Sequence, residues 1–276
     1  MTSSTVAVQA FFVQQVVMYF VSVPYLTMNW IKGELPNTTV KSAILILAYG
    51  LFCVMSSLFF YLALDHLSAG DAVAISNCYF APTLLFARLF LKERIHPIQI
   101  VFVIASIVGV FLVARPDFIF DHVDSYQSTE GKDKVLGIVV SVLSNIFTSA
   151  RLIVGRKLMN RASVAQLTTS FSLLTLISFV IYAKTRNEGW YIPCPSDWLY
   201  LIVNALCICI SITLTTLALR LERAGLVSVG YSLLIVFAFV LESLVFQFLP
   251  QLTSVIGASL VLAGSVGTVF IQMKCT

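Results

Sequence analysis

Nine stretches of about 20 mainly apolar residues follow one another along this chain, and they constrain its fold more than any other feature. The hydrocarbon core of a bilayer is about 30 Å thick, and a helix needs about 20 apolar residues to cross it. Each stretch has roughly this length, so each is a predicted membrane span. The nine stretches cover residues 5–29, 39–63, 71–91, 97–115, 135–155, 163–183, 198–219, 225–247 and 252–273.

The composition supports membrane spans and excludes an ordinary water-soluble domain. Hydrophobic residues make up 59% of the chain and charged residues 11%, whereas a soluble domain has about 45–50% and about 25%. The stretches are apolar on every face, while the strands of a membrane barrel alternate over about 9–11 residues. We therefore predict an all-α polytopic protein with the lipid bilayer as its main surroundings.

The basic residues orient the predicted spans. Loops that bear more Lys and Arg face the cytosol. We therefore expect a cytosolic C-terminus, in the plasma membrane or in an endomembrane of the Golgi or endoplasmic reticulum. The larger set of basic residues lies on the loops after the first, third, fifth and seventh spans and on the tail: Lys32, Lys41, Lys92, Arg94, Arg156, Lys157, Arg161, Arg220, Arg223 and Lys274.

An internal repeat is visible when the chain is shifted by 155 residues. Residues 63–74 read ALDHLSAGDAVA and residues 218–229 read ALRLERAGLVSV, and the same shift places Gly109 on Gly264. Five predicted spans separate a residue from its counterpart, so the two copies cross the membrane in opposite directions. Inverted repeats of this kind are typical of secondary transporters, which bind substrate near the bilayer midplane where the repeats meet.

The repeat predicts the domain organisation. We assign residues 1–120 to a first repeat of four spans, residues 121–134 to an extracytosolic loop and residues 135–276 to a second repeat of five spans. A symmetric parent would have five spans in each half, so the pattern predicts a five-plus-five transporter in which the first helix is missing.

Several motifs carry a resemblance to a known family. The chain contains GDAVAIS, LKERIHPIQ, GVFLVARPDFIF, RKLMNR, ALRLERAGLVSVG and FAFVLES. With these motifs it resembles the drug/metabolite transporter superfamily, in particular the EamA-like branch and the solute carrier family 35 member G group. The resemblance implies a multi-pass transporter of nucleotide sugars, organic anions, amines or other metabolites.

Charged residues within the spans are few. A charge at the centre of a span costs at least about 2.5–3.5 kcal/mol, so it needs a partner or a function. Arg88 and Arg151 are candidates to bind an anionic substrate, because a guanidinium group pairs with carboxylate or phosphate through two hydrogen bonds. Glu242 is a candidate gating or proton-coupling residue. The alternative for all three is that the side chain reaches the membrane surface.

Uncharged polar residues form a second group of candidates. Asn77 and Ser232 coincide under the 155-residue shift, about a third of the way into their spans. Pro82 lies within the third predicted span, where it removes a helix hydrogen bond and favours a kink that serves as a gating hinge or as a static bend. The candidate substrate-binding residues of this group are Asn77, Tyr79, Asn145, Tyr231 and Ser232.

Together these features favour a transporter over other function classes. We expect a secondary transporter that moves a small anionic metabolite, of the carboxylate or nucleotide-sugar class, by alternating access. The alternative is a membrane scaffold or regulator of a partner protein that uses the same fold. The sequence shows no constellation typical of an enzyme or metal site, so we expect no catalytic residue, cofactor, metal or nucleic-acid partner, and leave a homodimer open.

Overall fold

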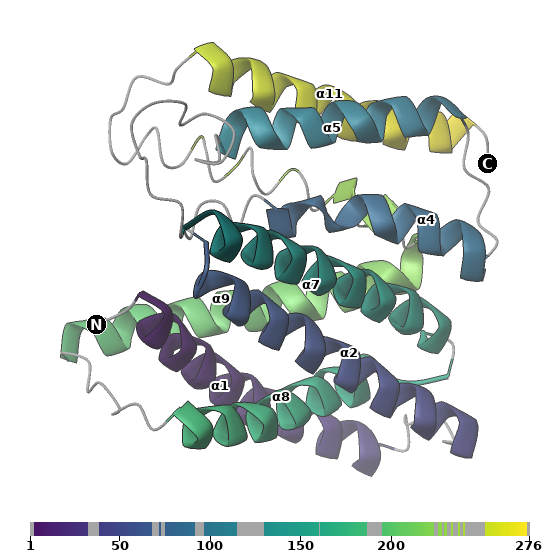
Figure 1. Cartoon of the computed structure of the whole chain (residues 1–276). Helices are drawn as coiled ribbons and strands as arrows, with labels where there is room; N and C mark the ends of the chain where they lie inside the picture. The colour runs from purple at the N-terminus through teal and green to yellow at the C-terminus, as the bar shows by residue number, and fades with distance from the viewer. Residues whose placement is uncertain are drawn as a thin grey trace. The chain divides into compact units, whose positions relative to one another are not determined.

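Helices make up nearly all of the described part of the chain. A computed structural model describes residues 3–32, 39–67, 72, 75–91, 97–114, 130–159, 161–186, 195–223, 226–227, 229–230, 233, 237, 240 and 252–274. No strand occurs among these residues, which confirms the predicted all-α class. The elements are α1 (Ser3–Ile31), α2 (Val40–Leu64), the 3₁₀ turn η1 (Asn77–Tyr79), α4 (Phe80–Leu91), α5 (Pro97–Ala114), α7 (Glu130–Leu158), α8 (Val164–Arg186), α9 (Pro195–Leu221) and α11 (Leu252–Lys274) (Figure 1).

Five helices in this part of the chain are long and apolar enough to cross a membrane. Three shorter apolar helices cover Asn77–Leu91, Pro97–Leu112 and Val255–Thr268. The predicted span 225–247 lies mostly outside the described residues, so the count of nine stays a prediction. The five long apolar segments are Phe11–Ile31, Val40–Leu64, Val135–Leu158, Val164–Ile181 and Trp198–Leu221.

The chain forms two compact units that interleave along the sequence. Unit 1 contains residues 1–61 and 154–221, and unit 2 contains residues 62–153 and 222–276. Each unit therefore draws helices from both predicted repeats. The division of the chain by internal repeat therefore differs from its division by spatial packing. The predicted repeat boundaries stay a prediction.

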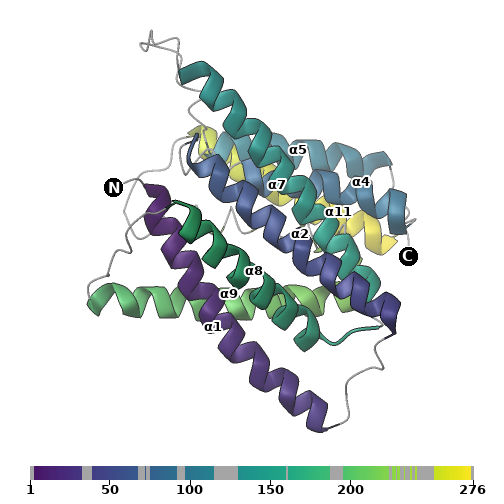
Figure 2. The ribbon, with the colours of Figure 1, turned by 60° about the horizontal axis from the view of Figure 1, so that its bottom comes forward.

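Unit 1 is built around α1, which packs against α8 and α9 (Figure 2). Three aromatic rings join α1, α2 and α8. The ring of Phe11 lies 5.0 Å from that of Tyr61 and 4.7 Å from that of Phe179, and the last two rings are 5.3 Å apart. Tilted and edge-on pairs at this spacing are favourable arrangements of aromatic quadrupoles, so this triad fixes the three helices to one another.

The C-terminal end of α9 is held by a residue from the end of α7. The Arg156 guanidinium donates a hydrogen bond to the Leu219 carbonyl, one of the last carbonyl groups of α9, which has no partner within its own helix. A cation there also complements the negative end of the helix dipole. Beside it, a Cβ atom on Gly155 would lie 3.2 Å from the Tyr49 ring, so the backbones of α2 and α7 approach closely.

Unit 2 is centred on the close packing of α5 against α11 (Figure 1). A Cβ atom on Gly109 would lie 2.6 Å from the Gly257 carbonyl oxygen, and one on Gly264 would lie 2.7 Å from the Phe102 carbonyl oxygen. A residue larger than glycine at either position would overlap with the facing backbone unless the helices moved apart. The buried apolar cluster around this contact consists of Phe80, Val103, Val110, Val229, Ala258 and Val261.

The α5/α11 contact is reciprocal under the 155-residue shift. A Cβ on Gly109 would meet Gly257 and Val261, and a Cβ on Gly264 would meet Phe102 and Ser106. The shift carries residues 102, 106 and 109 onto 257, 261 and 264. It also carries α2 onto residues 195–219, where α9 spans Pro195–Leu221. These coincidences are what an inverted repeat predicts, and the repeat itself stays a prediction.

Candidate functional site

An irregular turn interrupts the third predicted span. The 3₁₀ turn η1 leads directly into α4, and the flanking residues Ser76 and Phe80 both keep right-handed helical dihedral angles. Pro82 explains the interruption, since it has no N–H with which to bond the Cys78 carbonyl four residues earlier. Because Pro is tolerated in the first turn of a helix, α4 begins at Phe80.

A buried polar stripe on α7 lies against this turn. Ser141, Asn145 and Ser149 are spaced by four residues, so they share one helix face. Their exposed fractions are 0%, 6% and 0%. Uncharged polar groups that are so deeply buried must find hydrogen bonds or destabilise the fold.

Asn145 and Ser149 donate hydrogen bonds to carbonyl groups at the turn. Asn145 Nδ2 lies 2.7 Å from the Ile75 carbonyl oxygen, and Ser149 Oγ lies 3.0 Å from the Tyr79 carbonyl oxygen. In an apolar surrounding each unpaired carbonyl would cost several kcal/mol. The α7 stripe therefore supplies side-chain donors to two carbonyl groups at the turn, and it ties the turn to α7.

Thr83 completes the network from the first turn of α4. Its hydroxyl lies 3.0 Å from Ser149 Oγ and 2.8 Å from the Tyr79 carbonyl oxygen, and Thr83 is fully buried. A hydroxyl carries one hydrogen, so Thr83 donates to one of these acceptors at a time, while Ser149 donates to the Tyr79 or the Asn145 carbonyl. The network can switch between arrangements without leaving a donor unused.

Ser141, one turn before Asn145, lies at the N-terminal end of the stripe. Its hydroxyl is buried and has no hydrogen-bond partner within the described part of the chain. A buried hydroxyl in this state retains one donor and two acceptor positions.

The structure brings four predicted site residues together. Asn77, Tyr79 and Pro82 lie at the interrupted turn, where their side chains are half-buried, and Asn145 binds the same turn from α7. Thr83 and Ser149 were not predicted. Two signals could have identified them, because Ser149 follows Asn145 at helical spacing and Thr83 is adjacent to Pro82. Their roles in substrate binding stay a prediction.

The two predicted arginines lie on the same two helices. Arg88 is exposed in the last turn of α4, and Arg151 is half-buried on α7, two residues beyond Ser149. Both therefore belong to the elements that carry the polar network. Tyr231, Ser232 and Glu242 lie outside the described residues.

The site as described is uncharged at its centre. Amide, hydroxyl and carbonyl groups supply the hydrogen bonds described above, and among the described residues no cluster of His, Cys, Asp or Glu could hold a metal ion. Chemically, the turn offers polar groups held at fixed positions in an apolar environment, where hydrogen bonds are stronger than in water.

Comparisons with known proteins identify relatives. Residues 2–115 match the EamA-like transporter family. The chain is 30% identical to human solute carrier family 35 member G1 over 208 residues, which is 75% of this chain and 57% of that protein. It is 28% identical to the mouse protein of the same name over 219 residues, 79% of this chain and 59% of that protein. The chain thus spans less than two thirds of the length of both relatives.

A solved structure shares the fold. A protein crystal structure that is 18% identical in sequence superposes with a TM-score of 0.75 and covers 98% of this chain and 92% of its own. At this level of identity the likeness concerns the fold alone. It extends over nearly the whole chain, including both compact units.

Proposed function

We propose that this integral membrane protein is a secondary transporter, because residues 2–115 match the EamA-like transporter family and the chain is 30% identical to human solute carrier family 35 member G1 over 208 residues. We propose that it moves a small organic anion, of the carboxylate or nucleotide-sugar class, by alternating access. The observation that carries this proposal is the interrupted apolar span at Asn77–Tyr79, tied to α7 by buried polar side chains.

An interruption in a membrane-spanning helix costs free energy in a bilayer. We therefore expect it to serve a function. Irregular backbone at membrane depth is tolerated where it is buried in protein or lines a water-filled cavity, and transporters place their substrate sites at such interruptions. Here the turn presents Asn77 and Tyr79, and Ser141 continues the polar stripe on α7. The turn is the proposed substrate site of unit 2.

The proposed preference for anions rests on Arg88 and Arg151. Each guanidinium group can pair with a carboxylate or phosphate through two parallel hydrogen bonds. Arg88 lies on the helix that begins at the interrupted turn, and Arg151 lies on the helix that holds it. An anion bound between the turn and these arginines would be neutralised by residues of the same two helices.

The hydrogen bonds across α4 and α7 also suggest how the site moves. Any hinge at Pro82 that separates the turn from α7 must break the bonds of Asn145 and Ser149 to backbone carbonyls. We propose that the turn and this part of α7 move together during alternating access. Glu242 is the proposed coupling residue, and Glu242→Gln should abolish the pH dependence of uptake while it leaves exchange intact.

Uptake into proteoliposomes tests the proposed function. Labelled di- and tricarboxylates, nucleotide sugars and amines are offered to the wild type, to Arg88→Ala and to the control Arg220→Ala. Arg220 is also an exposed arginine in the last turn of a helix, α9. Saturable uptake of one anion that is lost in Arg88→Ala and retained in Arg220→Ala is the expected result.

The same experiment separates the transporter from the scaffold. Absence of uptake for every compound, with a wild-type protein that shows a cooperative melting transition, would contradict transport and favour a membrane scaffold. Equal loss of uptake in both arginine variants would leave transport intact as a function but remove Arg88 from the substrate site.

A further inference from the structure

One face of α1 carries a polar residue between two contacts with α8. Phe11, Gln15, Met18 and Ser22 are spaced by three or four residues and therefore share a face. Met18 and Gln15 are fully buried and Ser22 is 5% exposed, whereas Phe20, on another side of the helix, is 70% exposed. The face that carries Gln15 is thus directed into unit 1.

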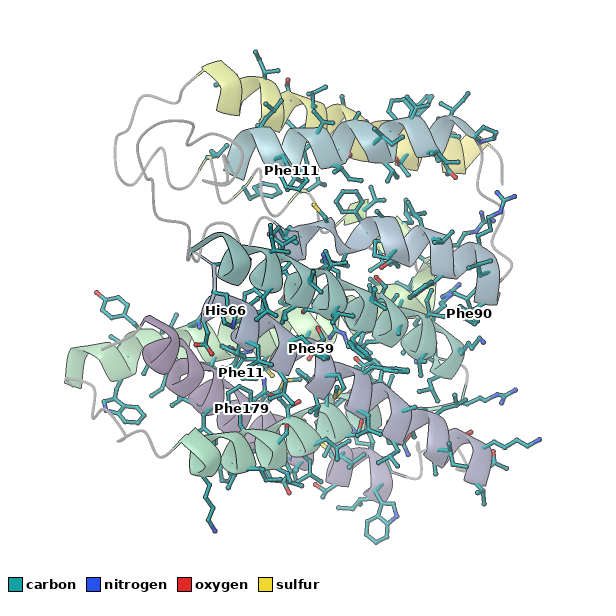
Figure 3. The ribbon with its side chains drawn as sticks, viewed as in Figure 1. Phe11, Phe59, His66, Phe90, Phe111 and Phe179 are labelled. Atoms are coloured by element: carbon teal, nitrogen blue, oxygen red, sulfur yellow. The ribbon has the colours of Figure 1, made fainter. Side chains whose placement is uncertain are left out.

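Two contacts fix the register between α1 and α8. The Phe11 ring packs against Phe179 at 4.7 Å, as Figure 3 shows for the two labelled side chains. Ser22 Oγ lies 3.5 Å from Ser172 Oγ. The higher-numbered residue on α1 meets the lower-numbered one on α8, so the helices are antiparallel. Linear interpolation between these contacts places Gln15 level with residues 176–177, within one helical turn of Thr175.

Gln15 has no hydrogen-bond partner among the residues that the structure describes. Both Oε1 and Nε2 are buried and lack a partner within the described part of the chain. Thr175 is fully buried, and its hydroxyl donates to the Phe171 carbonyl at 2.7 Å, which leaves its oxygen free to accept. A buried carboxamide whose donor and acceptor are both unused destabilises the fold, and a bound group that offers an acceptor and a donor would satisfy it.

The surroundings of Gln15 favour an uncharged group. The α1 sequence from Ser3 to Ile31 contains no charged residue, and α8 contains none before Lys184. A charged ligand group at the level of Gln15 would therefore have no counter-charge on either helix, and an unpaired charge in a low dielectric is far more costly than a neutral polar group. A hydroxyl or a carboxamide has the required donor and acceptor without a charge.

We propose that the Gln15 carboxamide binds a hydroxyl or carboxamide group of the transported molecule and thereby determines substrate specificity. The proposal rests on the transport function proposed above and adds a neutral recognition site in unit 1. The aromatic triad of Phe11, Tyr61 and Phe179 borders it on one side, about one helical turn from Gln15 along α1, and the Ser22–Ser172 pair borders it on the other.

The test compares pairs of substrates that differ by one hydroxyl. Uptake of malate is measured against succinate, and uptake of a nucleotide sugar against its deoxy analogue, for the wild type, Gln15→Met and Gln14→Met. Methionine keeps the length of the side chain and removes the amide. Gln14 is the matched control, because it is the neighbouring buried glutamine on α1, about 100° around the helix.

We expect the wild type to prefer the hydroxylated member of the transported pair by about tenfold, the value of one hydrogen bond. Gln15→Met should abolish this preference, and Gln14→Met should retain it. Without substrate, Gln15→Met should melt at a higher temperature than the wild type, because an unsatisfied amide is removed.

Each other result overturns the proposal. An unchanged preference in Gln15→Met, or an equal loss in Gln14→Met, removes Gln15 from substrate recognition, and a lower melting temperature with unchanged preference indicates a structural water at the amide. Wild-type uptake that shows no preference for the hydroxylated compound also removes Gln15 from substrate recognition. Absence of wild-type uptake overturns the transport function as well. If Gln15→Met does not fold, Gln15→Asn keeps the amide, retracts it by one methylene and should reduce the preference.

Discussion

The α1/α8 contact of unit 1 and the α5/α11 contact of unit 2 join helices in two different ways. In the first, aromatic rings and hydroxyl groups separate the helices, and the buried amide of Gln15 has no hydrogen-bond partner in the described part of the chain. In the second, glycines bring carbonyl groups of one helix against the backbone of the other. Contacts through side chains leave positions for a ligand group, whereas contacts through the backbone leave none.

This difference suggests that the two helix contacts have different roles during transport. A backbone contact has few alternative arrangements, since a shift along either helix brings atoms into overlap. A contact through rings and hydroxyls can rearrange rotamers and hydrogen bonds. We therefore expect α5 and α11 to stay fixed to each other during transport and α1 and α8 to adapt. Four substitutions test this comparison, in order of decreasing effect.

Gly109→Leu should have the largest effect. The new side chain must displace the Gly257 carbonyl and Val261, and overpacking against a rigid neighbour costs about 3 kcal/mol. The melting temperature of the purified protein in mild detergent measures the loss. Gly230→Leu is the control, because a Cβ at Gly230 meets no atom of the described residues within 4 Å. Equal melting temperatures for the two variants would show that the backbone contact does not limit stability.

Asn145→Ala should follow with a loss of about 2 kcal/mol, because it leaves the Ile75 carbonyl buried without its side-chain donor. This variant asks whether polar contacts in unit 2 are as adaptable as those of unit 1. Ser141→Ala on the same stripe should change stability by less than about 0.5 kcal/mol, since the Ser141 hydroxyl has no partner among the described residues to lose. A larger loss in Ser141→Ala than in Asn145→Ala contradicts the described network.

Phe11→Leu should cost about 1 kcal/mol. The substitution keeps an apolar side chain and removes the ring contacts with Tyr61 and Phe179, which are worth about 0.5–1.5 kcal/mol beyond their buried area. The loss of melting temperature should exceed that of Phe20→Leu on the same helix, because Phe20 is 70% exposed. If the exposed position is the more sensitive one, the triad does not hold α1.

Ser22→Ala should have the smallest effect, about 0.5 kcal/mol, the average for a hydrogen bond between membrane helices. Each hydroxyl of the Ser22–Ser172 pair also has a carbonyl acceptor in its own helix, at 3.2 Å for Ser22 and 3.1 Å for Ser172. Neither is left unpaired when the other is removed. A loss above about 1.5 kcal/mol in a melting experiment would falsify the view that this contact is adaptable.

Most helices could be predicted from the sequence because apolarity alone specifies a membrane span. The predicted spans 39–63 and 252–273 agree with α2 (Val40–Leu64) and α11 (Leu252–Lys274) to within a residue at each end. The prediction 135–155 was shorter than α7 (Glu130–Leu158) at both ends. Hydropathy detects only the part of a helix that can enter lipid, and polar residues such as Lys132 can continue the helix outside it.

The candidate site could be predicted only in part. Pro82 indicated an irregularity in its span, and Asn77, Tyr79 and Asn145 were predicted as polar candidates. The sequence could not predict that the 3₁₀ turn lies upstream of the proline, or that Asn145 donates to a backbone carbonyl 70 residues away. Such pairings depend on the register of one helix against another. The same holds for Gln15, since a polar residue in a span is satisfied or unsatisfied according to its neighbours in space.

The interleaving of the two units has a consequence for biosynthesis. Unit 1 is complete only when residues 154–221 have packed against residues 1–61. Unit 2 is complete only when residues 222–276 have packed against residues 62–153. During translation, neither unit can finish packing before most of the chain has left the ribosome. The early helices therefore lie in the membrane for some time with their packing faces uncovered. Closing such long loops is slow. Polar groups such as Gln15 are then exposed to lipid or to chaperones during membrane insertion.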